Sequence, residues 1–125
     1  KINEKIIVRL NKKEDIQTSM KIILADKSID GLLCLEESSA IACLALVKAM
    51  NYKIPDEMSI ICFTNGKLPQ HVTPTITTIS QHGKYIGEVA AKLLINRLES
   101  KTKLDFTTKI IKTSLIERDT TFHLK

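Results

Sequence analysis

Aromatic residues are scarce in this chain. Tryptophan is absent, and phenylalanine and tyrosine supply only 4% of the 125 residues. A hydrophobic core must therefore consist mainly of Ile, Leu, Val and Ala, within a hydrophobic content of 43%. Charged residues make up 26%, a balance typical of a globular protein, which excludes a disordered or fibrous chain. A chain of this length corresponds to one domain or to a piece of one.

Long apolar runs are also missing. None reaches the roughly 18 residues of a membrane span. The opening stretch KINEKIIVRLNKK lacks the apolar core of a signal peptide. We therefore expect a cytoplasmic protein without membrane contact. The chain begins without methionine, which indicates a fragment of a longer protein.

Cysteine pairs and clustered metal ligands are missing as well. The cysteines are odd in number, form no Cys-x-x-Cys pair and lie in apolar runs, at Cys34, Cys43 and Cys62. This pattern indicates buried, reduced thiols. A zinc site needs closely paired ligands, whereas the histidines are scattered, at His71, His82 and His123. We predict neither a metal site nor a cofactor.

Basic residues exceed acidic ones, 19 to 14, which gives a formal net charge of +5. Such a balance can indicate binding to nucleic acid or to an anionic membrane. Here the lysines are spread along the chain, and no predicted helix carries a dense basic stripe interleaved with aromatic residues. We interpret these lysines as a solvated surface.

The spacing of apolar residues predicts alternating strands and helices. Strands are expected at 5–10, 32–35, 58–63 and 75–80 and in part of 107–117, and helices after residue 11, over about 38–50 and over 84–100. Strands joined by connections of this length pair in parallel through right-handed crossovers. The sequence therefore predicts a layered α/β fold.

The helix predicted at 38–50 departs from the usual amphipathic pattern. Ten of the eleven residues from Ala40 to Met50 are apolar, so no ordinary polar face remains for water. One side can pack on the sheet, whereas the other needs a further layer or a partner chain, and we predict a partner. The expected partner surface comprises Ala42, Ala45, Leu46 and Ala49, among which the alanines allow close approach.

Several phrases stand in an order and spacing that are more specific than any one of them. They are Ile29-Asp30-Gly31, the Ala-rich helix, Ile54 to Ser59, Pro74 to Gln81, Ile86 to Ala90, and Arg118-Asp119-Thr120-Thr121. With these phrases the chain resembles the effector-binding domain of the lactose/galactose repressor family of bacterial transcriptional regulators. The resemblance implies a three-layer, parallel-sheet α/β domain of the periplasmic-binding-protein-like type (type I).

The resemblance also implies a bilobed domain that binds a small-molecule effector, such as a sugar or sugar derivative, between its lobes and forms a homodimer. Residues 1–125 would be a fragment of it, with the C-terminal lobe at about 1–75 and 106–125. The helix at about 82–100 would belong to the other lobe. In this fragment its apolar stripe would have to pack against another surface, for example in an exchanged dimer. Operator DNA would be bound by an amino-terminal helix-turn-helix that this sequence does not contain.

Candidate ligand-binding residues follow the predicted strands, because ligands of open α/β sheets bind beyond the carboxyl ends of the strands. This position indicates Glu36 and Glu37 after one strand and Thr64 and Asn65 after the next. The resemblance adds a pocket-edge glutamine, and residues near the end of the first strand, Leu10 and Asn11, are weaker candidates. The predicted ligand-binding set is Glu36, Thr64, Asn65, Gln81 and Asn11.

Two of these positions depart from the family pattern. Sugar-binding members of the family use an asparagine at the place of Glu36 and an aspartate at the place of Thr64 to bind ligand hydroxyls. The bidentate carboxylate of the family's aspartate is therefore lost at Thr64, and a new negative charge appears at Glu36. The effectors of the family cannot be carried over to this chain.

The same residues also have structural interpretations. Asn65-Gly66 is typical of a turn that requires positive φ. Glu36 is also explained as a solvated carboxylate that the helix dipole favours. Ser38 or Ser39 is expected to cap the helix rather than act as a nucleophile, because no histidine lies at a predictable distance to serve as base.

The first functional hypothesis is a regulatory domain in which the effector changes the relative pose of two lobes. The alternative is a solute-binding protein of the same fold, which the free thiols, the apolar helix and the closing ERDTT stretch disfavour. An enzyme with Glu36 and Glu37 as acid and base is also disfavoured, because adjacent residues at a strand end point to opposite sides. The four glycines are isolated and form no phosphate-binding loop.

Overall fold

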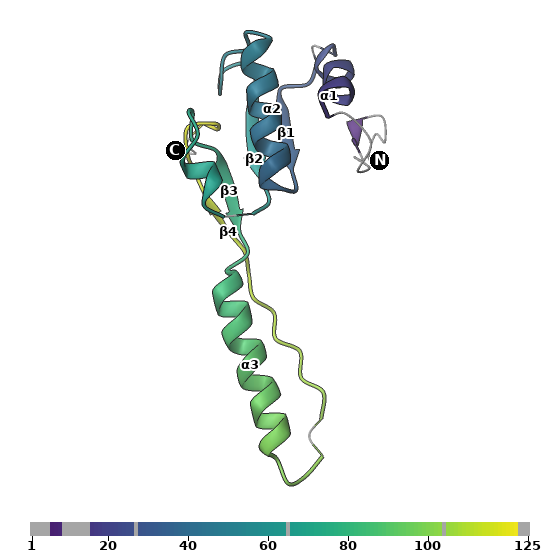
Figure 1. Ribbon diagram of the computed structural model, residues 1–125, viewed down its shortest axis with the longest axis vertical. Helices are drawn as coiled ribbons and strands as arrows, with labels where there is room; N and C mark the ends of the chain where they lie inside the picture. Colours follow the sequence, from purple (N-terminus) through teal and green to yellow (C-terminus); the bar gives the residue numbers. More distant parts are fainter. Residues whose placement is uncertain (1–5, 9–15, 27, 65, 104, 123–125) are drawn as a thin grey trace.

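Four strands form one sheet with helices beside it (Figure 1). The computed structural model describes residues 6–8, 16–26, 28–64, 66–103 and 105–122. The sheet has the order β1-β2-β3-β4, with β1 at Gly31–Cys34, β2 at Ser59–Cys62, β3 at Thr77–Ser80 and β4 at Ser114–Ile116. The helices are α1 (Ile16–Leu24), α2 (Glu37–Ala49), the 3-10 turn η2 (Leu68–Gln70) and α3 (Gly83–Glu99). The predicted α/β class is confirmed.

The first three strands are parallel and the last one reverses. β1 pairs with β2 along its whole length, with Cys34 opposite Cys62 at the carboxyl ends. β2 pairs in parallel with β3, whereas β4 runs antiparallel to β3 and places Ser114 opposite Ser80. The carboxyl ends of β1, β2 and β3 and the start of β4 therefore lie at one edge of the sheet.

The core lies between one face of the sheet and the helices α1 and α2. Alternation along β2 places Ile60 and Cys62 on this face, both with 0% exposure. The buried apolar residues are Met20, Leu24, Cys34, Ala40, Cys43, Leu44, Leu46, Val47, Met58, Ile60, Cys62 and Ile76. They are aliphatic or sulfur-containing, as the composition predicts. On the opposite face Leu33 is 63% exposed, so that part of the sheet lacks cover within the described residues.

The start of the chain and the start of α2 differ from the prediction. Most of the strand expected at 5–10 lies outside the described residues, and the described part, 6–8, is not a strand. The predicted caps Ser38 and Ser39 lie inside the first turn of α2, because the helix begins after Glu36. The backbone of Glu36 is extended, with φ −132° and ψ 151°, which is the usual conformation before a helix.

One face of α2 remains exposed. Leu46 belongs to the core, whereas Ala45 and Ala49 are exposed and Ala42 is half-buried. Beside them Lys48 donates a hydrogen bond to the carbonyl oxygen of Thr73 at 2.9 Å. Of the predicted partner surface, the three alanines are therefore available on the outside and Leu46 is engaged within the chain.

A network of hydroxyl hydrogen bonds holds the C-terminal segment against the sheet. Thr120 is fully buried, donates from Oγ1 to the carbonyl oxygen of Ile60 at 2.6 Å, and accepts from the N–H of Thr77 at 2.9 Å. The Thr77 hydroxyl accepts from the N–H of Arg118 at 2.9 Å, and Arg118 Nη1 donates to the carbonyl oxygen of Ile76 at 2.7 Å. The closing ERDTT stretch thus completes the polar pairing of β3.

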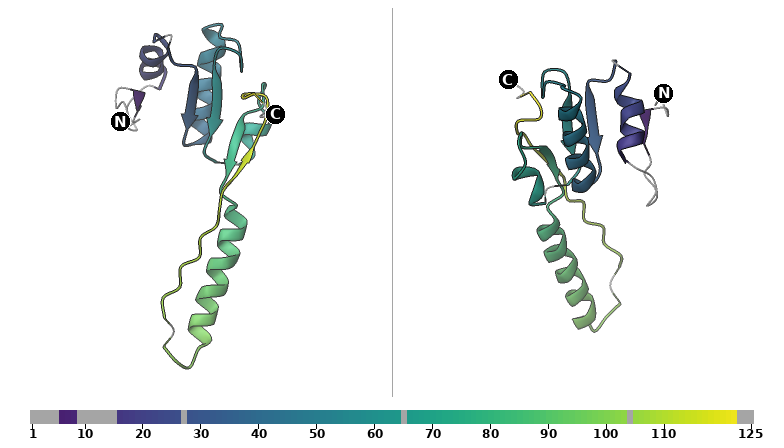
Figure 2. Two further views of the ribbon diagram at one scale, coloured as in Figure 1. Left: turned by 180° about the vertical axis from the view of Figure 1, so that it is seen from behind. Right: turned by 45° about the horizontal axis from the view of Figure 1, so that its top comes forward.

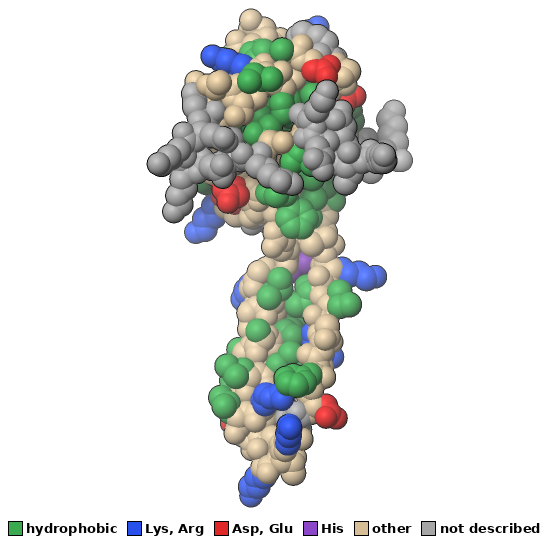
Figure 3. All heavy atoms as spheres, turned by 90° about the vertical axis from the view of Figure 1, so that its right-hand side faces the viewer, with side chains coloured by type: hydrophobic (Ala, Val, Ile, Leu, Met, Phe, Trp, Pro, Cys, Tyr) green, Lys and Arg blue, Asp and Glu red, His purple; other side chains and the backbone are tan. Residues whose placement is uncertain are grey.

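The helix α3 projects from the sheet as an arm. The chain returns from the end of α3 to β4 along the helix, as the views in Figures 1 and 2 show. None of the α3 residues is buried. Exposed large apolar side chains run along it, at Tyr85, Ile86, Leu93, Leu94, Ile95 and Leu98. They are called the apolar stripe of α3, and Figure 3 shows hydrophobic side chains at several places along the arm. Among the described helices, none is long and apolar enough to cross a membrane.

Candidate functional site

β1, β2 and β3 end at the sheet edge next to α3 (Figure 1), and polar residues follow each of these strands. Two hydrogen bonds link the segments that leave these strands. The N–H of Phe63 donates to the carbonyl oxygen of Cys34 at 2.7 Å, and Gln81 Nε2 donates to the carbonyl oxygen of Phe63 at 2.8 Å. The three strand ends are thereby fixed relative to one another, which is what a binding site on a rigid scaffold requires.

Glu37 is the acidic residue that lies over this edge. It is the first residue of α2, and its carboxylate packs against Gly66, where any added side chain would collide with it. Burial raises the pKa of the Cys62 thiol, and the negative charge of Glu37 adds to that rise. Gly66 does not have a positive φ, and Asn65 lies outside the described residues, so the turn expected at Asn65-Gly66 stays a prediction. The Glu37 carboxylate is the end of a flexible side chain that can move aside, so this contact alone does not require a glycine.

The other predicted ligand residues are only partly brought together. Thr64 is half-buried two residues after the end of β2, and its backbone N–H donates to the thiol of Cys62. It is thus one residue from Phe63, the residue that Gln81 contacts. Glu36 is exposed and lines a cavity of about 360 Å³, whose lining includes Ser39 but neither Thr64 nor Gln81. The remaining candidates, Asn11 and Asn65, lie outside the described residues.

A histidine pairs with a serine where the chain crosses between the sheet and the α3 arm. His82 Nε2 lies 3.1 Å from Ser114 Oγ, so this contact joins the outgoing and the returning segments. His82 has a left-handed backbone, with φ 54° and ψ 46°, and its N–H donates to Ser80 Oγ at 3.3 Å. A left-handed histidine is uncommon. The sequence did not identify this pair, because the antiparallel pairing of β4 brings Ser114 to His82.

This edge offers a carboxylate, a hydroxyl and an amide on adjacent strand ends. Such groups suit the recognition of a small polar molecule with several hydroxyl or amine groups. In the part of the chain that the structure describes, no group of three His, Cys, Asp or Glu residues could hold a metal ion. The chemistry available at the edge is therefore hydrogen bonding and charge pairing.

Residues 2–121 match the family described as "Periplasmic binding protein-like domain". Among curated proteins, the chain is similar to the transcriptional repressor PurR of Vibrio cholerae, with 28% identity over 65% of this chain and 24% of that protein. It is 33% identical to a probable opine utilization operon repressor of Rhizobium rhizogenes, over 70% of this chain and 44% of the repressor. The chain thus spans less than half of either relative.

A similar solved structure is a LacI-family transcriptional regulator of Enterococcus faecalis with bound ribose. The two share 29% identity and a TM-score of 0.74, over 88% of this chain and 40% of the regulator. The match to the family covers nearly the whole chain, and the mostly parallel sheet agrees with it. The chain therefore belongs to the periplasmic binding protein-like family, as a part of an effector-binding domain of the LacI/GalR type.

Proposed function

We propose that this chain is the effector-sensing and dimerising part of a bacterial transcriptional regulator in the LacI/GalR family. The observation that carries the proposal is a contact at the sheet edge next to the start of α3. There Gln81 donates a hydrogen bond to the carbonyl oxygen of Phe63, the residue directly before Thr64. A ligand bound there would contact the strand ends and the arm together. It would therefore influence how the arm is oriented relative to the sheet, which is the requirement for a ligand-controlled switch.

The proposed effector is a small polar molecule, such as a sugar or a sugar derivative. Glu36, Thr64, Asn65, Gln81 and Asn11 are the proposed ligand-binding residues. The ribose bound to the Enterococcus regulator and the opine operon named for the Rhizobium repressor both support polar effectors. Thr64 contributes a hydroxyl where an aspartate would contribute a charge, so an uncharged hydroxyl group fits this chain well.

We propose further that α3 packs against a second lobe. The stripe on α3 has no buried residue, and the solved regulator extends well beyond the part that this chain matches. The C-terminal lobe would comprise about 1–75 and 106–125, and the helix at about 82–100 would belong to the other lobe. Operator DNA would be bound by a further domain, a helix-turn-helix. The repressors among the relatives support this DNA-dependent role.

The proposed homodimer uses the outer face of α2. Ala45 and Ala49 are exposed and Ala42 is half-buried, so two copies of the helix can approach closely there. Leu46 supports this face from within the core. A regulator of this kind acts in the cytoplasm without catalysis, which agrees with its three free, buried thiols and with relatives that are repressors.

A thermal-shift screen of the full-length protein tests the effector role. Ribose, other sugars, sugar phosphates, opines and nucleosides are added in turn. A ligand at 100 times its dissociation constant adds about 2.7 kcal/mol to the free energy of unfolding. Thr64→Ala and Gln81→Ala are expected to abolish or weaken the shift, whereas the matched control Thr102→Ala, an exposed site just beyond α3, leaves it unchanged. A ligand whose shift survives both site substitutions would contradict the proposed site.

A further inference from the structure

Three buried thiols converge beneath the sheet edge. Cys34 and Cys62 lie opposite each other at the ends of β1 and β2. Cys43, in the second turn of α2, contacts Cys34 from the helix that covers the buried face of the sheet. The thiols are free, and their residues are 7%, 0% and 4% exposed for Cys34, Cys62 and Cys43. The ligand-sensing role assigns no task to any of them.

Cys34 and Cys43 influence each other's pKa. The interaction with Cys34 lowers the pKa of Cys43 against the effect of burial, whereas the interaction with Cys43 and burial both raise the pKa of Cys34. Cys43 is thus the thiol that ionises first, and Cys34 keeps its proton. For Cys62, burial raises the pKa.

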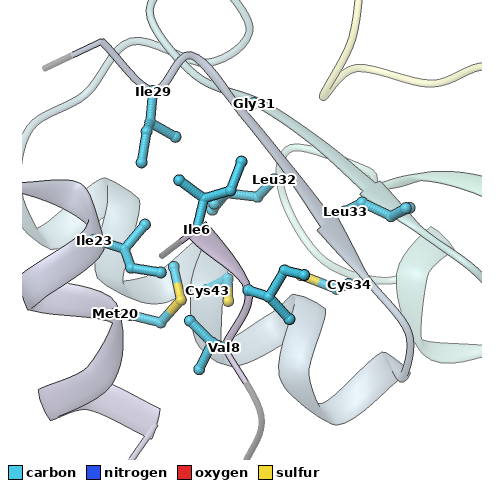
Figure 4. A pocket seen from close by; sticks show the side chains of 11 residues that line it. Ile6, Val8, Met20, Ile23, Ile29, Gly31, Leu32, Leu33, Cys34 and Cys43 are labelled. Carbon is cyan, nitrogen blue, oxygen red and sulfur yellow. The ribbon is translucent and has the colours of Figure 1, made fainter. Parts of the chain in front are cut away.

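The pair also differs from Cys62 in access. A cavity of about 420 Å³ between α1, β1 and residues 6–8 is lined by both Cys34 and Cys43 (Figure 4). The rest of its wall is mainly aliphatic. The neighbouring cavity of about 360 Å³ also reaches both cysteines, whereas Cys62 lines neither cavity. A small uncharged molecule in these cavities therefore meets Cys34 and Cys43 but not Cys62.

We infer that Cys34 and Cys43 form an oxidisable dithiol site, which a hydroperoxide converts to a disulfide between β1 and α2. Both thiols line the same two cavities, one from the end of β1 and the other from α2, and their disulfide requires an S–S bond length of about 2.05 Å. The disulfide would covalently fix the end of β1 to the helix that begins with Glu37. The inference rests on the thiol pair and its cavities, and it does not depend on the proposed effector.

The reaction proceeds in two steps. The Cys43 thiolate attacks the peroxide, so that an S–O bond forms and the O–O bond breaks. The released alkoxide takes up the proton that Cys43 lost, and it leaves as an alcohol. Cys34 then attacks the sulfur of the Cys43 sulfenic acid, the S–S bond forms and the S–O bond breaks, and water leaves with the Cys34 proton. The two thiols are oxidised and the hydroperoxide is reduced.

Peptide mapping of the full-length protein tests the inference. The native protein is treated with a small excess of tert-butyl hydroperoxide, alkylated with iodoacetamide in denaturant, and digested without reductant. The expected product is a peptide pair joined through Cys34 and Cys43, which dithiothreitol separates. Cys62 is expected to be recovered in its alkylated form. A disulfide that includes Cys62, or full alkylation of all three cysteines after the treatment, would overturn the inference.

Single substitutions assign the two roles. In Cys34→Ala, the reaction should stop at a sulfenic acid on Cys43, which dimedone traps. In Cys43→Ala, loss of the thiolate should slow oxidation of the remaining pair member about tenfold or more. Cys62→Ala is the matched control, with an unchanged rate of Cys34–Cys43 oxidation. Circular dichroism verifies the fold of each variant, and the mapping of the unsubstituted protein decides the question if a variant does not fold. Equal dimedone labelling of Cys62 and Cys43 in Cys34→Ala would contradict the assignment.

Discussion

Similar aliphatic residues are buried in the sheet and in α2 but exposed on the α3 arm. Ile60 on β2 has 0% exposure and Val47 on α2 also has 0%. On α3, Leu94 is 59% exposed and Leu98 is 76% exposed, although both belong to a regular apolar stripe. Hydrophobic residues alone therefore do not make a core. What separates the two regions is the presence of a second surface against which a stripe can pack.

The polar contacts of the two regions differ in the same way. Around β3, Thr120 and Arg118 satisfy backbone groups inside the fold. On the arm, the Arg97 guanidinium lies 4.9 Å from the ring centre of Phe106, a residue that is itself 94% exposed. An exposed contact of this kind contributes only about 0.5–1 kcal/mol. The sheet region is thus stabilised from within, whereas the described contacts of the arm lie at its surface.

The largest expected effect lies in the core. Ile60→Ala removes a fully buried side chain from β2, so it should lower the free energy of unfolding by about 2–5 kcal/mol. Urea denaturation followed by far-UV circular dichroism measures the change. Ile60→Val is the control, since it shortens the side chain by one methylene and should cost about 0.5–1.5 kcal/mol. Equal stabilities for Ile60→Ala and the unsubstituted chain would mean that the sheet and α2 do not form this core.

The hydroxyl of Thr120 should have the next largest effect. Thr120→Val keeps the shape of the side chain but leaves the carbonyl of Ile60 and the N–H of Thr77 without this partner. The expected loss is about 1–3 kcal/mol, which is the cost of unsatisfied buried polar groups. Thr120→Ser retains the hydroxyl and should recover most of that loss. If Val and Ser variants melted alike, the hydrogen bonds would not be the reason for the threonine.

The sequence predicts elements well where the local pattern decides the structure. The apolar run at 58–63 is confirmed as β2, Ser59–Cys62, and the stripe at 84–100 is confirmed as α3, Gly83–Glu99. Gln81 is expected from the family resemblance alone, whereas strand-end reasoning places Glu36 and Thr64 at one edge, because parallel strands end together. These features need only periodicity and chain direction, and both are properties of the sequence itself.

The remaining features depend on contacts that are distant in sequence. The start of α2 at Glu37 makes Glu36 the cap, so the expected serine caps were wrong. The contact of the Glu37 carboxylate with Gly66 joins the start of α2 to the segment after β2, and no local sequence pattern predicts it. The contact of His82 with Ser114 needs the antiparallel β4, which the predicted parallel sheet did not include.

Two left-handed residues provide a smaller test, one in each region. Asn51 follows α2 with φ 60°, and His82 precedes α3 with φ 54°. An alanine in this conformation costs roughly 1–2 kcal/mol, so Asn51→Ala should destabilise the sheet region by about that amount. Asn51→Gly, which has no such cost, serves as the control. Thermal unfolding measures the difference, and equal midpoints for the Ala and Gly variants would contradict the left-handed assignment.

His82→Ala should have a weaker effect on the sheet region than Asn51→Ala. The substitution removes the contact with Ser114 and places an alanine in a left-handed backbone conformation. Both changes lie at the base of the arm rather than in the sheet region. Hydrogen exchange is expected to increase in α3 and in the return segment while the protection of β2 is retained. An equal loss of protection in β2 would show that the arm and the sheet unfold together, which would break the distinction between the two regions.

The smallest expected effect is on the outer stripe of α3. Leu94 is 59% exposed, so Leu94→Ala in the 125-residue chain should change the free energy of unfolding by less than about 0.5 kcal/mol. The same substitution in the full-length protein should cost about 2–5 kcal/mol if a second lobe buries the stripe as proposed. Lys92→Ala, an exposed polar site on the same helix, is the matched control and should stay near zero in both proteins. Because the substitution is identical in both proteins, a loss of stability seen only in the full-length protein would measure how far its additional residues bury Leu94. Equal, near-zero costs in both proteins would leave the stripe exposed and remove the reason for assigning α3 to a second lobe.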